Sequence, residues 1–117
     1  AERMTSTELA QRIADAASDK RAREVVTLDI RGKTTIADYF VICEGDTDRQ
    51  VRAIVDSIEE ACKAAGQRPL SIAGVDDASW ACIDVDSVIA HVFLPGERTF
   101  YDLEGLWGDG DSERATV

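Results

Sequence analysis

Residues 39–43 read Tyr39-Phe40-Val41-Ile42-Cys43, a nearly continuous apolar run in a chain of 117 residues of which 31% are charged. A short apolar run of this kind is typical of a strand that is buried on both faces of a sheet. The loop after it, Gly45-Asp46-Thr47-Asp48, is expected to cap a helix. That helix is expected to end at Gly66, and its apolar face consists of Val51, Ile54, Val55, Ile58, Cys62 and Ala65. A strand followed at once by such a helix predicts an α/β domain.

The residues before this strand predict a helix and another strand. Thr5 and Glu8, three positions apart, form the sequence pattern of a capping box. The helix that follows has its apolar residues at helical spacing, at Leu9, Ile13, Ala16 and Ala17. Residues 24–30 are rich in β-branched side chains and predict a strand. Residues 31–33 are expected to turn the chain, and residues 34–38 to form a short connection that could hold one helical turn.

Three further strands are expected after the periodic helix, at residues 68–72, 80–84 and 88–94. The last two are joined by a short connection, so they are expected to form an antiparallel hairpin. The periodic helix joins two strands across roughly twenty residues, which is long enough for a parallel crossover. Residues 100–107 predict a turn or a short helix.

The expected order of elements is therefore α-β-β-α-β-β-β-α, in a mixed five-stranded sheet with flanking helices. A single domain is expected to cover residues 1–117, since a chain of this length buries about two-thirds of its unfolded surface. Residues 1–3 precede Met4 and are interpreted as a cloning remnant. The polar residues 108–117 are expected to form a flexible tail.

The chain is acidic, with 23 Asp and Glu residues against 13 Lys and Arg residues and a formal net charge of −10. Such a surface repels phosphate backbones, and affinity for nucleic acid rests largely on contacts between cations and phosphates. Little direct contact with nucleic acid is therefore expected, and a basic protein partner is favoured. The alternative interpretation is that the acidity only keeps a small domain soluble.

No apolar run approaches the roughly 20 residues that span a bilayer, and the sequence has no recognisable secretory signal. A cytoplasmic protein without a membrane association is therefore expected. The three cysteines, Cys43, Cys62 and Cys82, are far apart and have apolar neighbours. They are interpreted as reduced core residues, so a structural metal site is not expected.

Two carboxylates, Asp84 and Asp86, stand near the expected end of a strand, and Asp29 lies on a strand that could be a neighbour. Such a cluster could hold Mg²⁺ for phosphoryl transfer, as in nucleotidyltransferase folds. Those enzymes also need an upstream Gly-Ser loop for the triphosphate, and no such loop precedes this pair. The chain is therefore not expected to be an enzyme, and the simpler interpretation is that Asp84 and Asp86 flank a hairpin turn.

Five of the seven aromatic residues lie between positions 80 and 107, and the only histidine lies among them. Aromatic side chains supply much of the area and energy of protein–protein contacts. They could equally close the core, and the simplest interpretation of His91 is a buried histidine with one satisfied hydrogen bond. Residues 101–107 alternate large apolar residues with acids, so they either fold back onto the sheet or face a partner.

Two blocks are specific in combination, Ala37-Asp38-Tyr39-Phe40-Val41 and Tyr101-Asp102-Leu103-Glu104-Gly105-Leu106-Trp107. Other informative positions are Ile36, Ile42, Cys43, Arg49, Gln50, Val51, Gly74, Trp80, Asp84, residues 88–93 with His91, Arg98 and Phe100. Together these residues resemble the ribosomal silencing factor family, RsfS, also called Iojap-related proteins, over nearly the whole chain. The chain departs from the family at Ala73, where Glu is usual, and at Asp86-Ser87, where a Gly-Asp turn is common.

The resemblance implies a fold similar to that of nucleotidyltransferases, without their activity and without a cofactor. It also implies a translational repressor that binds ribosomal protein L-fourteen on the large (50S) ribosomal subunit. The bound repressor would sterically block association with the small subunit and damp translation under nutrient limitation or in stationary phase. Some members of the family form homodimers, so self-association is also implied.

The expected partner-binding residues combine aromatic, apolar and acidic side chains. They are Trp80, Asp84, His91, Phe93, Pro95, Tyr101, Asp102, Leu103, Glu104 and Trp107. Two other functions stay open, a nucleotidyltransferase-like enzyme and an acidic adaptor that binds another basic protein.

Overall fold

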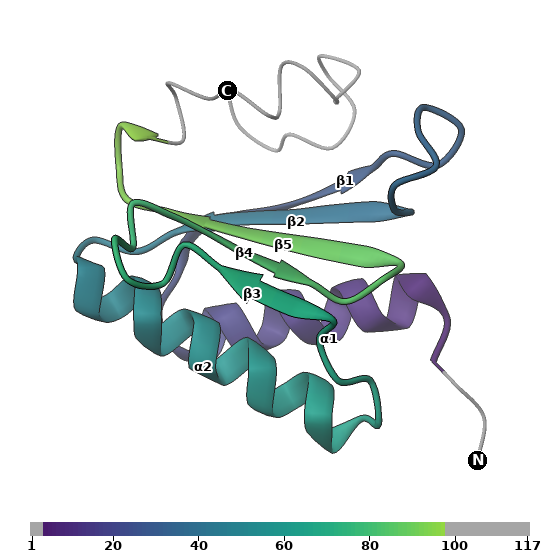
Figure 1. Cartoon of the computed structure of the whole chain (residues 1–117), viewed down its shortest axis with the longest axis horizontal. Coiled ribbons are helices and arrows are strands. Elements are labelled where there is room, and N and C mark those ends of the chain that lie inside the picture. Colours follow the sequence, from purple (N-terminus) through teal and green to yellow (C-terminus); the bar gives the residue numbers. More distant parts are fainter. Residues whose placement is uncertain (1–3, 98–117) are drawn as a thin grey trace.

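The computed structural model describes residues 4–97, in which helices α1 and α2 pack against a sheet (Figure 1). Along the chain the elements are α1 (Ser6–Asp19), β1 (Arg23–Asp29), β2 (Tyr39–Glu44), α2 (Asp48–Ala64), β3 (Ser71–Ala73), β4 (Trp80–Asp84) and β5 (Val88–Phe93). They occur in the predicted order, and the further element expected at residues 100–107 lies outside the described residues. Within residues 4–97, no helix has the length and apolar character needed to cross a membrane.

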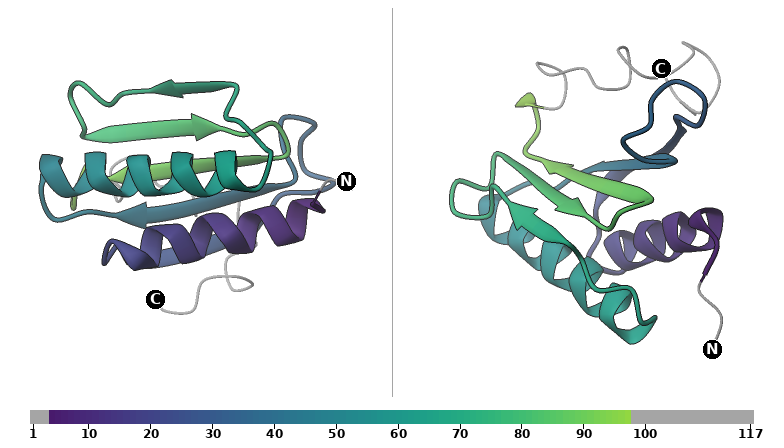
Figure 2. Two further views of the ribbon diagram at one scale, coloured as in Figure 1. Left: turned by 90° about the horizontal axis from the view of Figure 1, so that it is seen from below. Right: turned by 45° about the vertical axis from the view of Figure 1, so that its right-hand side comes forward.

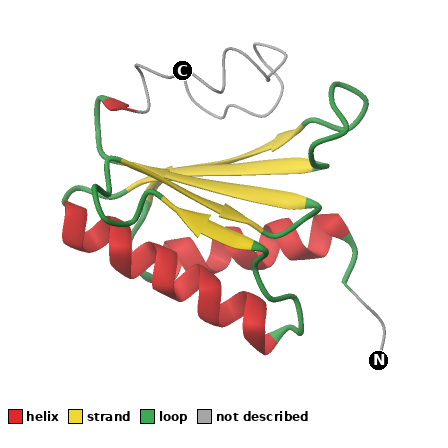
Figure 3. Cartoon of the chain, in the orientation of Figure 1, coloured by secondary structure: helices red, strands yellow, loops and turns green. Residues whose placement is uncertain are grey.

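The five strands form one mixed sheet in the order β1-β2-β5-β4-β3 (Figure 3). β2 and β5 are parallel, and the other neighbouring pairs are antiparallel, so the predicted mixed sheet and the hairpin of β4 and β5 are confirmed. α2 is a crossover between β2 and β3, which run in the same direction because two antiparallel pairings separate β3 from β5. Two strands, β5 and β4, lie between the strands that α2 joins.

Both helices cover the same face of the sheet (Figure 2). The core on this side contains the apolar faces of α1 and α2 and alternate residues of β2, namely Tyr39, Val41 and Cys43. Phe40 and Ile42, which alternate with these residues along β2, point to the opposite face of the sheet. We call this face, which is turned away from α1 and α2, the far face. The core of the far face consists of Leu28, Ile30, Ala37, Phe40, Ile42 and Phe93. β2 is thus buried on both faces, as its apolar run predicts.

The helix signals predicted at both ends are present. Thr5 and Glu8 form the capping box, in which the Thr5 hydroxyl accepts from the Glu8 N–H at 3.1 Å and the Glu8 carboxylate accepts from the Thr5 N–H at 2.9 Å. At the end of α2, the Gln67 N–H donates to the Cys62 carbonyl at 2.8 Å, the bond that defines a Schellman motif. Gly66 supplies the left-handed residue of this motif with a φ of 79°, so its predicted role as a C-terminal cap is confirmed.

Two local predictions are wrong. The strand expected at residues 68–72 begins later, at the start of β3, because Pro69 has no N–H to donate to a neighbouring strand. Residues 34–38 contain no helical turn but form part of the loop between β1 and β2. There the Ile30 N–H donates to the Asp38 carbonyl at 3.0 Å, which extends the antiparallel pairing of the two strands and closes the loop without a helix.

Gly74 follows β3 in a conformation that a residue with a side chain cannot adopt without strain. Its φ is 81°, and a Cβ built on it would overlap the carbonyl oxygen of Trp80. We expect Gly74→Ala to lower the free energy of unfolding by about 3 kcal/mol or more, because backbone strain adds to an overlap with main-chain atoms. Urea-induced unfolding followed by circular dichroism measures the loss.

Gly66→Ala is the matched control for this substitution. Gly66 has a similar φ of 79°, but within the described part of the chain no atom lies within 4 Å of the position that a Cβ would take. We expect this variant to lose only about 1 kcal/mol, the strain of the left-handed backbone alone. Equal losses in the two variants would contradict the close approach of Gly74 to Trp80.

Candidate functional site

Strands β4 and β5 bring four of the predicted site residues to the far face. Side chains alternate between the two faces along a strand, so Trp80 and Asp84 of β4 share one face. In the antiparallel pairing Trp80 lies opposite Phe93, and Cys82 lies opposite His91. The hairpin thus makes neighbours of residues that are well separated in the sequence.

The rings on the far face pack against one another in a cluster. The Trp80 indole stacks on Phe93, with centroids 5.3 Å apart and planes inclined by 24°. The Phe40 ring of β2 meets the His91 ring edge-on, with centroids 4.7 Å apart. Aromatic pairs in these geometries add about 0.5–1.5 kcal/mol each beyond their buried area. Sequence reasoning missed Phe40 as a site residue, although the alternation of faces along β2 is the signal that places it here.

His91 is buried, with 6% of its surface exposed. Its Nδ1 accepts a hydrogen bond of 3.1 Å from the indole Nε1–H of Trp80, so the proton of the neutral ring lies on Nε2. Burial lowers the pKa of His91 from its ordinary 6.5 to about 4. Among the residues that the structure describes, none accepts a hydrogen bond from Nε2. His91 is therefore a buried histidine with one satisfied ring nitrogen, which agrees with the simplest interpretation of its sequence.

Cys82 and His91 lie close together but do not form a nucleophilic pair. The Cys82 Sγ lies 3.5 Å from the His91 Nδ1. Burial raises the pKa of the Cys82 thiol and lowers the pKa of His91, so both groups are neutral near pH 7. A reactive cysteine needs a thiolate, which this arrangement does not stabilise. The three cysteines form no disulfide with one another; Cys43 and Cys62 are buried, as predicted, whereas Cys82 is half-buried.

Asp84, the last residue of β4, and Asp86 support the turn that joins β4 to β5. The Asp86 N–H donates to the Asp84 Oδ1 at 2.9 Å, and Asp86 has a left-handed φ of 72°. The expectation that Asp29 could lie beside this pair is wrong, because β2 and β5 separate β1 from β4. The Asp29 carboxylate instead pairs with Arg31 at 2.6 Å, and this bond lowers the pKa of Asp29. Within residues 4–97, no group of three or more acidic, histidine or cysteine side chains could hold a metal ion.

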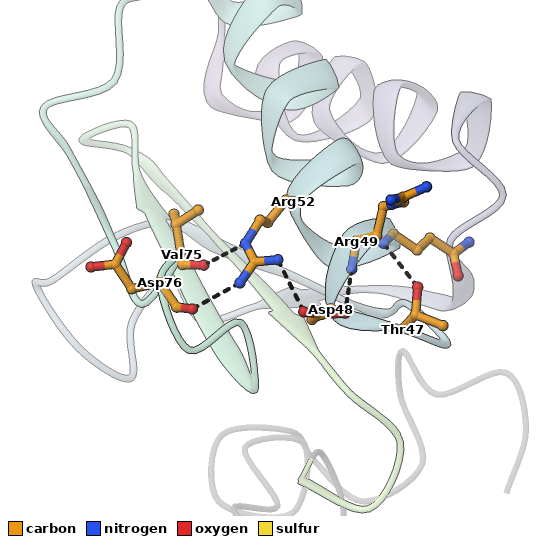
Figure 4. A network of polar contacts seen from close by, with 7 residues as sticks. Thr47, Asp48, Arg49, Arg52, Val75 and Asp76 are labelled. Carbon is orange, nitrogen blue, oxygen red and sulfur yellow. Dashed lines mark hydrogen bonds and ion pairs between the residues drawn. The ribbon is translucent and has the colours of Figure 1, made fainter.

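A polar network holds the loop that leads into Trp80 (Figure 4). The Arg52 guanidinium of α2 donates to the carbonyl oxygens of Val75 at 3.0 Å and Asp76 at 2.8 Å. It also donates to the Asp48 carboxylate at 3.0 Å, and this bond lowers the pKa of Asp48. Arg52 thereby ties the loop between β3 and β4 to the first turn of α2. The sequence carries no signal for this contact, because the carbonyl groups that accept are 23 and 24 residues away.

The other predicted site residues follow β5. Pro95 is exposed, two residues beyond the end of the strand. The end of β5 lies beside the start of the loop that connects β2 to α2, because the Gly45 N–H donates to the Phe93 carbonyl at 2.9 Å. The remaining predicted residues lie outside the described part of the chain; they are Tyr101, Asp102, Leu103, Glu104 and Trp107.

The buried His91 makes the stability of the fold depend on pH. The unfolded chain binds a proton at the ordinary pKa of 6.5, whereas the folded chain resists protonation until the pH falls to about 4. The stability that comes from keeping the ring neutral is complete above pH 6.5 and is lost as the pH falls toward 4. Between pH 7 and pH 5 we expect the free energy of unfolding to fall by about 2 kcal/mol.

Urea unfolding at pH 7, 6 and 5 measures this loss. His91→Phe is the control, because the variant has no titrating group at position 91 and should lose much less stability over the same range. Asp29 and Asp48 have lowered pKa values, so they titrate at more acidic pH. An equally steep loss in the variant would contradict a neutral, buried His91.

Comparison with known sequences identifies the relatives of the chain. A family model described as "Ribosomal silencing factor during starvation" matches residues 3–117. The ribosomal silencing factor RsfS of Bacillus subtilis is 43% identical over 96 residues, which cover 82% of this chain and 81% of that protein. A protein of Mus musculus named "Mitochondrial assembly of ribosomal large subunit protein 1" is 32% identical over 91 residues, which cover 75% of this chain and 40% of that protein.

A solved structure shares the fold. The crystal structure of a protein from Chromobacterium violaceum matches with a TM-score of 0.88 and 30% sequence identity, over 97% of this chain and 95% of that one. The mixed sheet with flanking helices is therefore common to both proteins, while the expected likeness to nucleotidyltransferases stays a prediction. The family model, the Bacillus relative and the shared fold all confirm the predicted resemblance: the chain belongs to the ribosomal silencing factor family, a family of ribosome-associated regulators of translation.

Proposed function

We propose that the chain represses translation by binding ribosomal protein L-fourteen on the large (50S) ribosomal subunit and sterically blocking association with the small subunit. Membership of the family supports a role on the ribosome, and the mouse relative has the large subunit in its name. The repression damps translation under nutrient limitation or in stationary phase. It needs no turnover and no cofactor, because a bound protein excludes the second subunit by occupying its place.

The observation that carries this proposal is the aromatic cluster on the far face. Trp80 is half-buried, and its indole is held by stacking on Phe93 and by the hydrogen bond to His91. A side chain that is already ordered loses little conformational entropy when a partner binds. Tryptophan is also enriched among the residues that dominate binding energy at protein interfaces. The partly exposed part of the far face around Trp80 therefore has the properties of a surface that binds another protein.

The charge of the chain supports a basic partner. A net charge of −10 attracts a basic ribosomal protein and repels ribosomal RNA. The proposed contacts are Trp80, Asp84, Pro95, Tyr101, Asp102, Leu103, Glu104 and Trp107, and the buried His91 and Phe93 pack against Trp80. We place this activity in the cytoplasm, and we propose that the chain also associates into a homodimer.

Trp80→Ala removes the central ring of the cluster. We expect it to weaken binding to isolated large subunits by about thirtyfold or more, because truncation of a central aromatic residue typically costs about 2 kcal/mol or more. Tyr101→Ala and Trp107→Ala are expected to weaken binding as well. Co-sedimentation with large subunits measures the affinity, and the later addition of small subunits measures the yield of joined ribosomes.

Leu70→Ala is the control for loss of an apolar side chain. Leu70 is 69% exposed and lies beside Asp84, at the other end of β4 from Trp80, so this variant should bind like the unaltered chain. Undiminished binding by a folded Trp80→Ala chain would rule out the proposed surface. If the unaltered chain does not bind clean large subunits, the proposed function is wrong. A thermal shift that depends on nucleotide and Mg²⁺ would then favour a nucleotidyltransferase-like enzyme. The absence of such a shift would favour an acidic adaptor that binds another basic protein.

A further inference from the structure

His91 occupies its position at a cost to stability. It is 6% exposed, and its Nε2–H has no acceptor among the residues that the structure describes. A buried donor without an acceptor destabilises a fold, whereas an apolar ring of similar shape in the same place does not. Within residues 4–97, packing alone therefore does not account for a histidine at this position.

The other ring nitrogen of His91 makes a contact that an apolar ring could not make. Nδ1 accepts the 3.1 Å hydrogen bond from the Trp80 Nε1–H, across the hairpin of β4 and β5. Phe93 stacks on the same indole at 5.3 Å, and Phe40 packs edge-on against the His91 ring at 4.7 Å. Stacking sets the plane of the indole, and the hydrogen bond sets its rotation within that plane. Together the two contacts fix the orientation of Trp80.

We propose that His91 is a positioning residue, whose Nδ1 holds the Trp80 indole in the orientation that the ribosomal partner binds, and that His91 does not itself contact the partner. The inference rests on the proposed function, because it assigns Trp80 to the binding surface. An indole that is fixed before the encounter loses less freedom on binding, so its preorganisation increases affinity.

Two substitutions of His91 separate positioning from packing. His91→Phe keeps a planar ring but has no acceptor for the indole N–H. His91→Asn loses the ring but keeps an acceptor, because its Oδ1 is as many bonds from the Cα as the imidazole Nδ1 is. A positioning role predicts that affinity does not follow stability in these two variants.

We expect His91→Phe to be about as stable as the unaltered chain at pH 7, because removal of the unsatisfied buried donor offsets the loss of the hydrogen bond from the Trp80 indole. Its affinity for isolated large subunits should nevertheless fall about three- to tenfold, the contribution of one hydrogen bond. We expect His91→Asn to be less stable, because it leaves a cavity, but to retain affinity close to that of the unaltered chain where it is folded. Affinities that simply follow stability across the three chains would overturn the positioning role.

The indole N–H signals report the hydrogen bond directly and need no ribosome. The chain has two tryptophans, and Trp80→Phe identifies which ¹H–¹⁵N indole cross-peak belongs to Trp80. We expect this signal to move upfield and to exchange faster with solvent in His91→Phe, and to stay protected in His91→Asn. An unchanged signal in His91→Phe would overturn the positioning role. Failure of the unaltered chain to bind large subunits would instead overturn the proposed function, and it would do so whatever the indole signal shows.

Discussion

The fold depends on the parallel pairing of β2 with β5 at the centre of the sheet. Each residue from Tyr39 to Glu44 has a partner between Val88 and Phe93. β1 lies beside β2 and β4 lies beside β5, so both central strands are paired on each side. Because side chains alternate along these strands, the pair contributes to the core under α1 and α2 and also to the core of the far face. The apolar run of β2 follows from this double burial, since a polar residue on either face would lack water.

The two faces of the sheet are suited to different tasks. The face under α1 and α2 is filled mainly by aliphatic and small side chains, which stabilise the domain. The far face concentrates rings around Trp80 and includes His91, whose buried Nε2–H has no acceptor among the described residues. Natural proteins accept such locally unfavourable residues where function requires them. On this face the Cys82 thiol is neutral near pH 7, and β2 and β5 separate Asp29 from Asp84.

Local patterns predict the parts of this fold that local interactions decide. The caps and apolar faces of α1 and α2, the buried β2 and the hairpin of β4 and β5 all belong to this class. Prediction fails where a distant partner or a missing donor decides, as at Pro69 and residues 34–38. No local pattern predicts that two strands, β5 and β4, lie between β2 and β3. For the site, strand alternation together with the register of the β4–β5 hairpin places Trp80 and His91 on one face. The bond between their rings and the contacts of Arg52 depend on atoms that only the folded chain brings together.

Electron cryomicroscopy of the chain bound to isolated large ribosomal subunits tests the central claim most directly. The account predicts that the far face, with Trp80 near the centre of the contact, lies against ribosomal protein L-fourteen, while α1 and α2 point away from it. It also predicts that the bound chain overlaps the space that the small subunit would occupy. A complex in which α1 and α2 make the contact, or in which the chain lies clear of the small subunit, would contradict it.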